Sequence, residues 1–308
     1  PAASVFARRC VARKAARIGE LLTGNEAKWH VAWRRITAQA ATQSESRELE
    51  LTAYRTLEDG GQRYFADPFV FTHEGTTHVF IEELPKATGK GIISHFTLAD
   101  DGTPSPVAPV LERDVHLSYP FVFAHEGGIY MLPESSAAGG LDLYRAKRFP
   151  HEWEKITRLI EGRIHDATLF AHDGRWWIAA GSENFQSSSW DGLSLFYADS
   201  LTGPWHPHPL NPVLVDAAAA RPAGALWRDD AGRLIRPAQD CTGGYGSRLT
   251  LRAITKLDPE TFAEETIGMV SFPARSGILG PHTLSRGGGF EVIDLFARPS
   301  ALRAGYRG

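Results

Sequence analysis

The sequence predicts an all-β protein that folds as a single five-bladed β-propeller. A strand–turn–strand pattern recurs five times along the chain, its copies lie about one propeller blade apart, and further strand-like segments follow four of them. The 308 residues, 43% of them hydrophobic, suffice for one domain of this size. The formal net charge of −3 argues against a nucleic acid partner, whose phosphates attract a basic surface.

The repeated pattern is an alternating apolar run, a short turn of His, Asp or Glu and Gly, and a second alternating run, which is typical of a β-hairpin. Three copies are clear: YFADPFVFTHEGTTHVFIEE (64–83), HLSYPFVFAHEGGIYMLPES (116–135) and RIHDATLFAHDGRWWIAAGSE (163–183). Two weaker copies lie at 221–240 and 280–296. The last apolar residue before the turn recurs roughly every 50 residues, as expected of four-stranded blades. It is Phe71, Phe123, Phe170, Trp227 and Leu284 in turn.

The other strands of each blade are predicted from segments that follow the hairpins. GIISHFTLA, LDLYRAKRF, LSLFYADS and LTLRAITKL supply third strands, and segments such as TRLIEG and FAEETIGMV supply outer ones. Little chain remains after the fifth hairpin. The segment KWHVAWRRI (28–36), in which Trp29, Val31 and Trp33 alternate with other residues, is therefore predicted to supply the missing outer strand of the fifth blade and close the ring.

We divide the chain into an N-terminal part, 1–48, and the propeller, 49–308. Residues 5–22 show a loose helical period and are predicted to form a basic linker helix packed on the domain, with contact to a membrane surface as the alternative. Residues 38–48 are polar and are expected to form a connection. No apolar run is long enough to span a membrane and no signal peptide is recognisable, which favours a soluble, cytoplasmic protein.

The first strand of every propeller blade lines the central channel, so the residues that open the five repeats are expected to converge there. They are Asp67, Tyr119, Asp166, Arg221 and His282. The second strands of the first four blades end in acids, which are Glu82, Glu83, Glu134, Glu183 and Asp240. Neighbouring side chains on a strand point in opposite directions, so only one of the first pair can face the channel, and Glu82 is the better candidate. Carboxylates in such a ring must be paired or functional.

The strings ADPFVF, IHDATLFAHDGRWW and YADSLTGPW (197–205) resemble the five-bladed propellers of glycoside hydrolase family 43 and its relatives. The resemblance implies that Asp67, an Asp before Pro on the first blade, is the general base. The chemistry needs a second, protonated carboxyl group, for which Glu134 and Asp166 are the candidates. The second blade departs from the family, because Tyr119 stands where those enzymes have an Asp.

A second resemblance is carried by LSYPFVF, YMLPES, RPAG, RPAQDC and YG. These strings are similar to the propeller module at the N-terminus of glucosamine inositolphosphorylceramide transferases. In the plant proteins the transfer reaction is ascribed to a different domain. This resemblance therefore implies a non-catalytic module that is fused to, or associated with, a transferase domain.

Substrate contacts are expected from a polar cluster on the fourth blade and from the channel rim. The planar guanidinium of Arg221 suits a carboxylate, sulfate or phosphate on a sugar, although an Arg–carboxylate lock between blades is an equally good interpretation. Trp190, in the polar loop QSSSWDG, is a candidate sugar platform. The full predicted substrate-binding set is Glu82, Tyr119, His165, Trp190, Arg221, Gln239, Asp240, Tyr245 and His282.

No cofactor and no catalytic metal are predicted. Cys10 and Cys241 fit neither a zinc site nor a disulfide framework, and TGGYGS lacks the Lys and the context of a phosphate-binding loop. His282 resembles an axial His near a bound ion in some family 43 propellers, which leaves a structural ion on the propeller axis as an alternative.

The sequence leaves three functions open and favours the first of them by a narrow margin. The first is a glycoside hydrolase or transglycosidase that uses paired carboxylates in the channel, acting on an anionic glycan or a glycolipid headgroup. The second is a non-catalytic glycan-binding or glycolipid-binding module of a biosynthetic transferase. The third is a scaffold for another protein, which predicts a channel filled by side chains.

Overall fold

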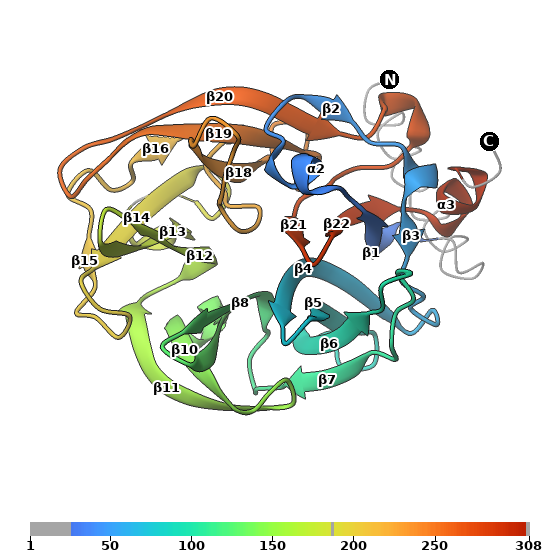
Figure 1. Ribbon diagram of the computed structural model, residues 1–308, viewed down its shortest axis with the longest axis horizontal. Coiled ribbons are helices and arrows are strands. Elements are labelled where there is room, and N and C mark those ends of the chain that lie inside the picture. The colour runs from blue at the N-terminus through green and yellow to red at the C-terminus, as the bar shows by residue number, and fades with distance from the viewer. Residues whose placement is uncertain (1–25, 186–187, 306–308) are drawn as a thin grey trace, which may run out of the picture.

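The computed structural model describes residues 26–185 and 188–305, and it confirms the five-bladed β-propeller. Five sheets surround a common centre (Figure 1). The helix predicted at 5–22 lies outside the described residues. Within the described ranges, no helix combines the length and the apolar character needed to cross a membrane.

The first three blades consist of consecutive strands ordered outward from the channel. Blade 1 holds β4 (Arg63–His73), β5 (Thr76–Pro85), β6 (Ile92–Leu98) and β7 (Ala108–Leu111). Blade 2 holds β8 (Ser118–His125), β9 (Gly128–Glu134), β10 (Gly140–Arg148) and β11 (Glu152–Glu161). Blade 3 holds β12 (Ile164–His172), β13 (Arg175–Ser182), β14 (Gly192–Ala198), β15 (His206–Pro207) and β16 (Leu214–Val215).

The last two blades also take strands from the N-terminal part of the chain. Blade 4 holds β17 (Trp227–Arg228), β18 (Leu234–Asp240), β19 (Arg248–Leu257), β20 (Phe262–Ser271) and β2 (Arg47–Glu48). Blade 5 holds β21 (Leu284–Gly287), β22 (Phe290–Ala297), β1 (Lys28–Arg35) and β3 (Arg55–Thr56). Short helices are α2 (Ala38–Thr42), α3 (Pro299–Gly305) and the 3-10 turns η1 (Leu51–Ala53), η2 (Ser136–Ala138), η3 (Glu183–Phe185) and η4 (Ala274–Ser276).

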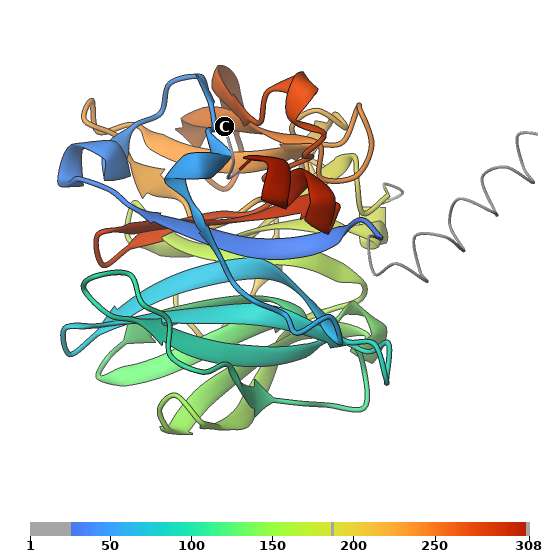
Figure 2. The ribbon, with the colours of Figure 1, turned by 90° about the vertical axis from the view of Figure 1, so that its right-hand side faces the viewer.

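The N-terminal strand closes the ring, as predicted. Strand β1 pairs antiparallel with β22 along its whole length, from Lys28 opposite Ala297 to Arg35 opposite Phe290. It is the third strand of its blade rather than the outer one, because the two-residue strand β3, too short to be recognised in the sequence, pairs with its other edge. Figure 2 shows the blue β1 lying directly beside the red β22. The two ends of the chain are thus held in one sheet.

The connection expected at 38–48 is more ordered than its polar sequence suggests. Thr37 caps the five-residue helix α2, its Oγ1 accepting a hydrogen bond from the backbone N–H of Ala40. Strand β2 then pairs in parallel with β20, so this segment ties the fourth blade to the fifth. Elements of five and two residues are too short to produce a readable period, which explains why the sequence did not reveal them.

The first three hairpins are closed by two-residue turns of matching chemistry. The turns Glu74–Gly75, Glu126–Gly127 and Asp173–Gly174 have positive φ at both residues. This geometry matches the twist of the paired strands, and glycine adopts it without steric cost at the second position. The acidic residue at the first position is held in the left-handed region.

A second backbone irregularity recurs where each of these blades opens onto the channel. The register between the first and second strands shifts beside Asp67, Tyr119 and Asp166. Their φ values are 49°, 45° and 48°, which is unusual for residues other than glycine. These β-bulges turn the backbone N–H of each residue toward the neighbouring blade.

The hydrophobic core lies between neighbouring blades. Five clusters of buried side chains fill the spaces between adjacent sheets, and the largest joins the fourth and fifth blades. Val31 and Trp33 of β1, with 0% and 2% exposure, belong to the cluster between the fifth and first blades. Burial of apolar surface between sheets therefore holds the ring together.

Candidate functional site

The first group of channel side chains is Asp67, His282 and Asp294, which join the first and fifth blades. The Nε2 of His282 is 3.3 Å from Oδ1 of Asp67, and its Nδ1 is 2.6 Å from Oδ2 of Asp294. Burial alone would lower the pKa of His282, but the charge of Asp294 outweighs it and raises the pKa to about 9. Burial raises the pKa of Asp67 well above its ordinary value, against the opposing charge of His282.

The second group is Asp166, Arg221 and Gln239, which join the third and fourth blades. The Nε of Arg221 donates to Oδ2 of Asp166 at 2.6 Å, and Nε2 of Gln239 donates to the same oxygen at 2.9 Å. The Nη1 of Arg221 also donates to the carbonyl of Ser189. Burial raises the pKa of Asp166 to about 7, although the charge of Arg221 opposes the shift.

The third group is Glu134, His165 and Glu183, which join the second and third blades. His165 bridges the two acids, with Nδ1 3.1 Å from Oε1 of Glu134 and Nε2 3.0 Å from Oε1 of Glu183. Burial alone would raise the pKa of Glu134, but the hydrogen bond from His165 and the charge of Arg221 outweigh it and lower the pKa to about 2. Glu134 is therefore ionised at neutral pH.

The bulged residues link these groups around the channel. The backbone N–H of Asp67 donates to Asp294, that of Tyr119 donates to Asp67, and that of Asp166 donates to Glu134, at 3.0, 3.2 and 3.0 Å. In each case the N–H comes from one blade and the carboxylate from the blade before it. Inward carboxylates thus connect neighbouring blades, so they have a structural role whatever their chemistry.

Glu82 and Glu83 point to different sides of β5, as their positions require. Glu82 lies 3.0 Å from Nε2 of His116, and its charge raises the pKa of Asp67. Glu83 instead pairs with Arg63 and accepts from Ser94. Glu82 is therefore the member of the pair that contributes to the channel.

Three partly exposed aromatic side chains lie beside the buried groups. Trp29 stacks on His282 with ring centroids 4.0 Å apart, and Tyr245 packs against His282 at 5.4 Å. Trp190 lies 5.6 Å from Tyr245 and is 46% exposed. The guanidinium of Arg221 lies 5.2 Å from the centre of the Tyr245 ring. We call Trp29, Trp190 and Tyr245 the aromatic platform.

Two predicted substrate-binding residues are placed away from this arrangement. Tyr119 is fully buried, and its hydroxyl is held between the Oγ1 of Thr168 and the backbone N–H of Gly224. Asp240 accepts hydrogen bonds from Thr242 and Arg248 and organises the loop that follows β18. Both side chains therefore form hydrogen bonds within the protein that stabilise its fold.

Other residues of the site had not been selected from the sequence. Asp294 is the acid between His282 and Asp67, and the Oγ1 of Thr283 donates to Asp67 at 3.0 Å. A signal for Asp294 exists, because it is an acid inside the apolar run FEVIDLF. Trp29 was assigned only to the closing strand. Its position in the platform depends on the pairing of β1 with β22, which the local sequence does not encode.

The group Asp67, His282 and Asp294 offers oxygen and nitrogen atoms close enough together to hold a metal ion. The fit is poor, however. Both oxygens of Asp294 already accept backbone N–H groups, from His282 and Thr283 on one side and from Asp67 on the other. His282, protonated at neutral pH, already supplies a positive charge between the acids. The imidazolium thus fills the electrostatic role of an axial cation.

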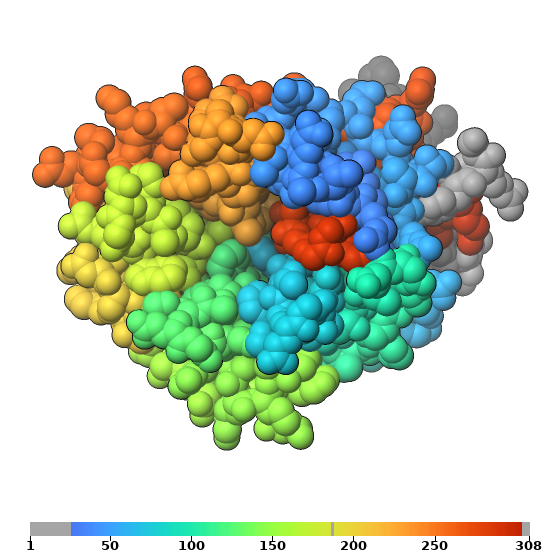
Figure 3. Space-filling model, in the orientation of Figure 1, coloured from blue at the N-terminus to red at the C-terminus, as the bar shows by residue number. Residues whose placement is uncertain are grey.

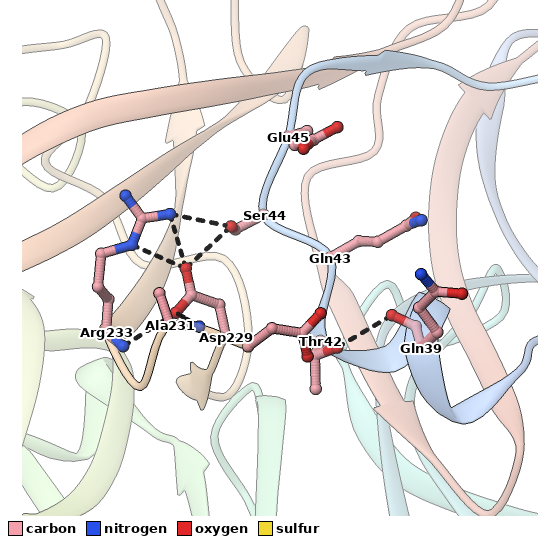
Figure 4. Close-up of a pocket in the computed structure, with 9 residues that line it drawn as sticks. Gln39, Thr42, Gln43, Ser44, Glu45, Asp229, Ala231 and Arg233 are labelled. Atoms are coloured by element: carbon pink, nitrogen blue, oxygen red, sulfur yellow. Dashed lines mark hydrogen bonds and ion pairs between the residues drawn. The ribbon is translucent and has the colours of Figure 1, made fainter.

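A separate pocket lies at the opposite end of the propeller, between α2 and the turn that joins β17 to β18 (Figure 4). Its one buried charged group, Asp229, pairs with Arg233 at 2.7 Å and accepts from Ser44 at 3.1 Å. The backbone N–H groups of Ala231 and Arg233 occupy its other oxygen. These contacts fix the turn and leave little for a ligand.

Comparison with solved structures agrees with the propeller fold. Zg3597, a family 117 glycoside hydrolase of Zobellia galactanivorans, superposes with a TM-score of 0.54 at 14% identity, covering 89% of this chain and 91% of that one. The exo-β-1,3-galactanase 1,3Gal43A of Clostridium thermocellum gives a TM-score of 0.55 at 10% identity, covering 79% and 59%. At these identities the likeness concerns the fold alone.

Comparison with known sequences identifies relatives at higher identity than the comparison with solved structures does. The chain is 35% identical over 228 residues to glucosamine inositolphosphorylceramide transferase 1 of Oryza sativa subsp. japonica, covering 72% of this chain and 30% of that protein. It is 33% identical over 218 residues to the Arabidopsis thaliana protein of the same name, covering 70% and 28%. The chain thus spans less than a third of the length of these relatives.

The model of one family matches residues 51–277, most of the propeller, and is described as glucosamine inositolphosphorylceramide transferase 1, N-terminal. Both the match and the identities reach well beyond the short strings that first suggested the relationship. This chain belongs to the family of the N-terminal domain of glucosamine inositolphosphorylceramide transferase 1.

Proposed function

We propose that this chain is a non-catalytic module that binds the sugar of a glycan or glycolipid headgroup at the aromatic platform. One observation carries the proposal: Trp29, Trp190 and Tyr245 form a partly exposed aromatic surface next to Arg221 and the channel acids. The apolar face of a sugar ring packs well on such rings, while the neighbouring polar groups hydrogen-bond its hydroxyls.

The burial, hydrogen bonding and ionisation of the channel acids argue against glycosidic bond cleavage. Asp67 and Asp166 are 5% and 3% exposed, and protein donors hold them in place. Glu134 is ionised at neutral pH, so it has no proton to give to a leaving oxygen. Paired, buried carboxylates of this kind suit a rigid binding surface better than a pair of catalytic acids.

The family supports the same choice of ligand class. The plant relatives are named for glucosamine, a sugar, and for inositolphosphorylceramide, a lipid with a phosphorylated headgroup, and this chain corresponds to less than a third of their length. A sugar-binding propeller would hold the headgroup for a transferase domain elsewhere in the same or a partner chain.

Hydrolysis is the second candidate function, and one observation favours it. The pKa of Asp166, raised by burial to about 7, lies where a general acid operates at neutral pH. In that case Asp166 would protonate the leaving oxygen while Asp67 activates water.

Binding and product analysis with the same ligand separate the two candidates. A glycan and glycolipid-headgroup array identifies a ligand, and calorimetry then compares wild type with Trp190→Ala. We expect roughly tenfold weaker binding, the usual effect of removing a central aromatic contact. The control is Ile156→Ala, an equally exposed apolar residue on β11, which should bind like wild type.

The outcome that would decide against the module is release of a cleaved sugar by wild type and its loss in Asp166→Asn. Binding that is unchanged in Trp190→Ala would remove the platform from the site.

A further inference from the structure

A small pocket at the end of the propeller away from the aromatic platform is lined by three arginines. It lies where β1 ends, between β3 and the turn that joins β6 to β7, and its volume is about 180 Å³. Arg34, Arg35 and Arg55 line it, and Asp101 is the one acid in its lining. Three arginines against one acid give the lining a net positive charge, on a chain whose formal net charge is −3.

The floor of the pocket is rigid and aromatic. Trp33 and Phe290 are 2% and 1% exposed, and Nε1 of Trp33 donates to the carbonyl of Gly102 at 3.0 Å, which joins the fifth blade to the first. The guanidinium of Arg35 lies 5.3 Å from the centre of the Phe290 ring, which restricts its position. The arginines are thus presented by packed elements rather than by free loops.

A buried charge imbalance lies next to the pocket and increases its positive potential. Glu291 is fully buried and receives three guanidinium groups, from Arg34, Arg47 and Arg286, together with the hydroxyl of Tyr54. One carboxylate neutralises only one of the three charges. Arg34 connects the two groups, since the residue lines the pocket while its guanidinium group is held on Glu291.

The other two arginines have unused hydrogen-bonding capacity. Among the described residues, neither Arg35 nor Arg55 forms a close ion pair, although the charge of Arg55 acts on Asp101 in the lining of the same pocket. Both are exposed, so their guanidinium groups can reach a ligand in the pocket. Planar guanidinium groups bind tetrahedral oxyanions with two hydrogen bonds each, which an ammonium group cannot do.

We propose that this pocket, which we call the arginine pocket, binds a phosphate group. The guanidinium groups of Arg35 and Arg55, with the charge of Arg34 beside them on Glu291, match the double negative charge and the several oxygens of a phosphate better than the single charge of a carboxylate. The volume excludes a long oligosaccharide, because pockets for drug-sized ligands occupy about 300–1,000 Å³. The phosphate is either free or part of a lipid headgroup, and both share the same recognition chemistry.

Figure 3 shows the end of the propeller on which the arginine pocket lies. The red hairpin between β21 and β22 lies beside the blue N-terminal segment and the cyan first blade. The aromatic platform lies toward the opposite end, where the first strands begin, since Trp29 and Arg35 stand at the two ends of β1. Phosphate binding is therefore independent of sugar binding at the platform.

The test uses two probes, inorganic phosphate followed by ³¹P NMR and phosphatidylcholine vesicles with or without phosphatidylinositol. The variants are Arg35→Ala, Arg55→Ala and the double variant, because Arg34 also holds the buried Glu291. Each single change should weaken binding about tenfold, the usual cost of losing one charge-assisted contact. The control is Arg145→Ala, another exposed arginine stacked on an aromatic ring, Tyr130.

Binding of inorganic phosphate that weakens in the two variants but not in the control supports a site for the free anion. Binding only to vesicles that contain phosphatidylinositol, with the same dependence on Arg35 and Arg55, supports a lipid headgroup. Binding of neither probe, or equal binding by the double variant and wild type at matched circular dichroism, overturns the proposal.

Discussion

At the scale of single residues, the channel shows how a buried acid is stabilised by neighbouring blades. Asp294 is fully buried and accepts backbone N–H groups from two blades. His282 then adds a positive charge 2.6 Å from it. Removing one member of such a buried pair leaves an uncompensated charge, which costs far more than the pair itself contributes. The group therefore fixes the geometry between the first and fifth blades.

This arrangement predicts a loss of stability in mild alkali. The pKa of His282 in the folded protein, about 9, lies above its unfolded value near 6.5. Its contribution is therefore fully present below pH 6.5 and is lost as the pH rises through about 9. A shift of this size corresponds to on the order of 3 kcal/mol.

Urea denaturation between pH 6 and pH 10 measures the effect, and NMR titration of the His282 ring measures the pKa directly. A ring that titrates near 6.5 would contradict the charge assignment.

The loss of stability at low pH has a different origin. The pKa of Glu134 is lowered to about 2, so its contribution to stability is present above its unfolded value near 4.5 and is lost toward pH 2.

Sequence reasoning at this scale found the acids but not their partners. Asp67, Glu134 and Asp166 were found because aligned repeats place equivalent residues at the channel. An Arg–carboxylate lock between blades was one of two interpretations of Arg221 and named no partner; in the structure Arg221 lies 2.6 Å from Asp166. The burial that raises or lowers each pKa depends on neighbours from other blades, which no single repeat contains.

At the scale of elements, the recurring hairpin is the feature that organises the propeller. The turns Glu74–Gly75, Glu126–Gly127 and Asp173–Gly174 hold an acidic residue in the left-handed region. That conformation costs a residue other than glycine on the order of 1 kcal/mol, and asparagine tolerates it better than glutamate. A residue that adopts the left-handed region more easily should therefore stabilise the protein at these turns.

We therefore expect Glu126→Asn to stabilise the protein by about 0.5–1 kcal/mol. The lost ion pair with His125 is exposed and contributes little. Glu126→Val should be destabilising, because a β-branched residue fits this conformation poorly. Thermal denaturation measures both variants.

A control for these substitutions is Glu154→Asn, an exposed position on β11 without the unusual φ. A gain in stability at Glu154 equal to that at Glu126 would show that the turn geometry is not the cause.

At the scale of the whole molecule, closure of the ring is the decisive contact. Strand β1 fills the third position of the fifth blade, between β22 and β3. Without it, β22 would expose a long unpaired edge, and such edges promote aggregation. Trp33 is the centre of this contact, since it is 2% exposed and its indole N–H reaches the first blade.

Trp33→Ala should therefore destabilise the protein by about 3–5 kcal/mol, the usual cost of removing a buried tryptophan. Chemical denaturation measures the change. Trp190→Ala is the matched control, because Trp190 is 46% exposed and its removal should alter stability by no more than about 0.5 kcal/mol. Equal effects of the two substitutions would contradict the role given to β1 in closure.

The sequence by itself determined the fold class, the five hairpins, the closing strand and three of the channel acids, Asp67, Glu134 and Asp166. Each of these follows from local patterns: alternation within strands, Gly-containing turns and repeats about one blade apart. Only the tertiary structure decided which acids are paired, which are ionised, and that Trp29, Trp190 and Tyr245 meet at one surface. The reason is physical: pairing, burial and charge depend on side chains that come from different blades, and their distances are fixed only when the ring closes.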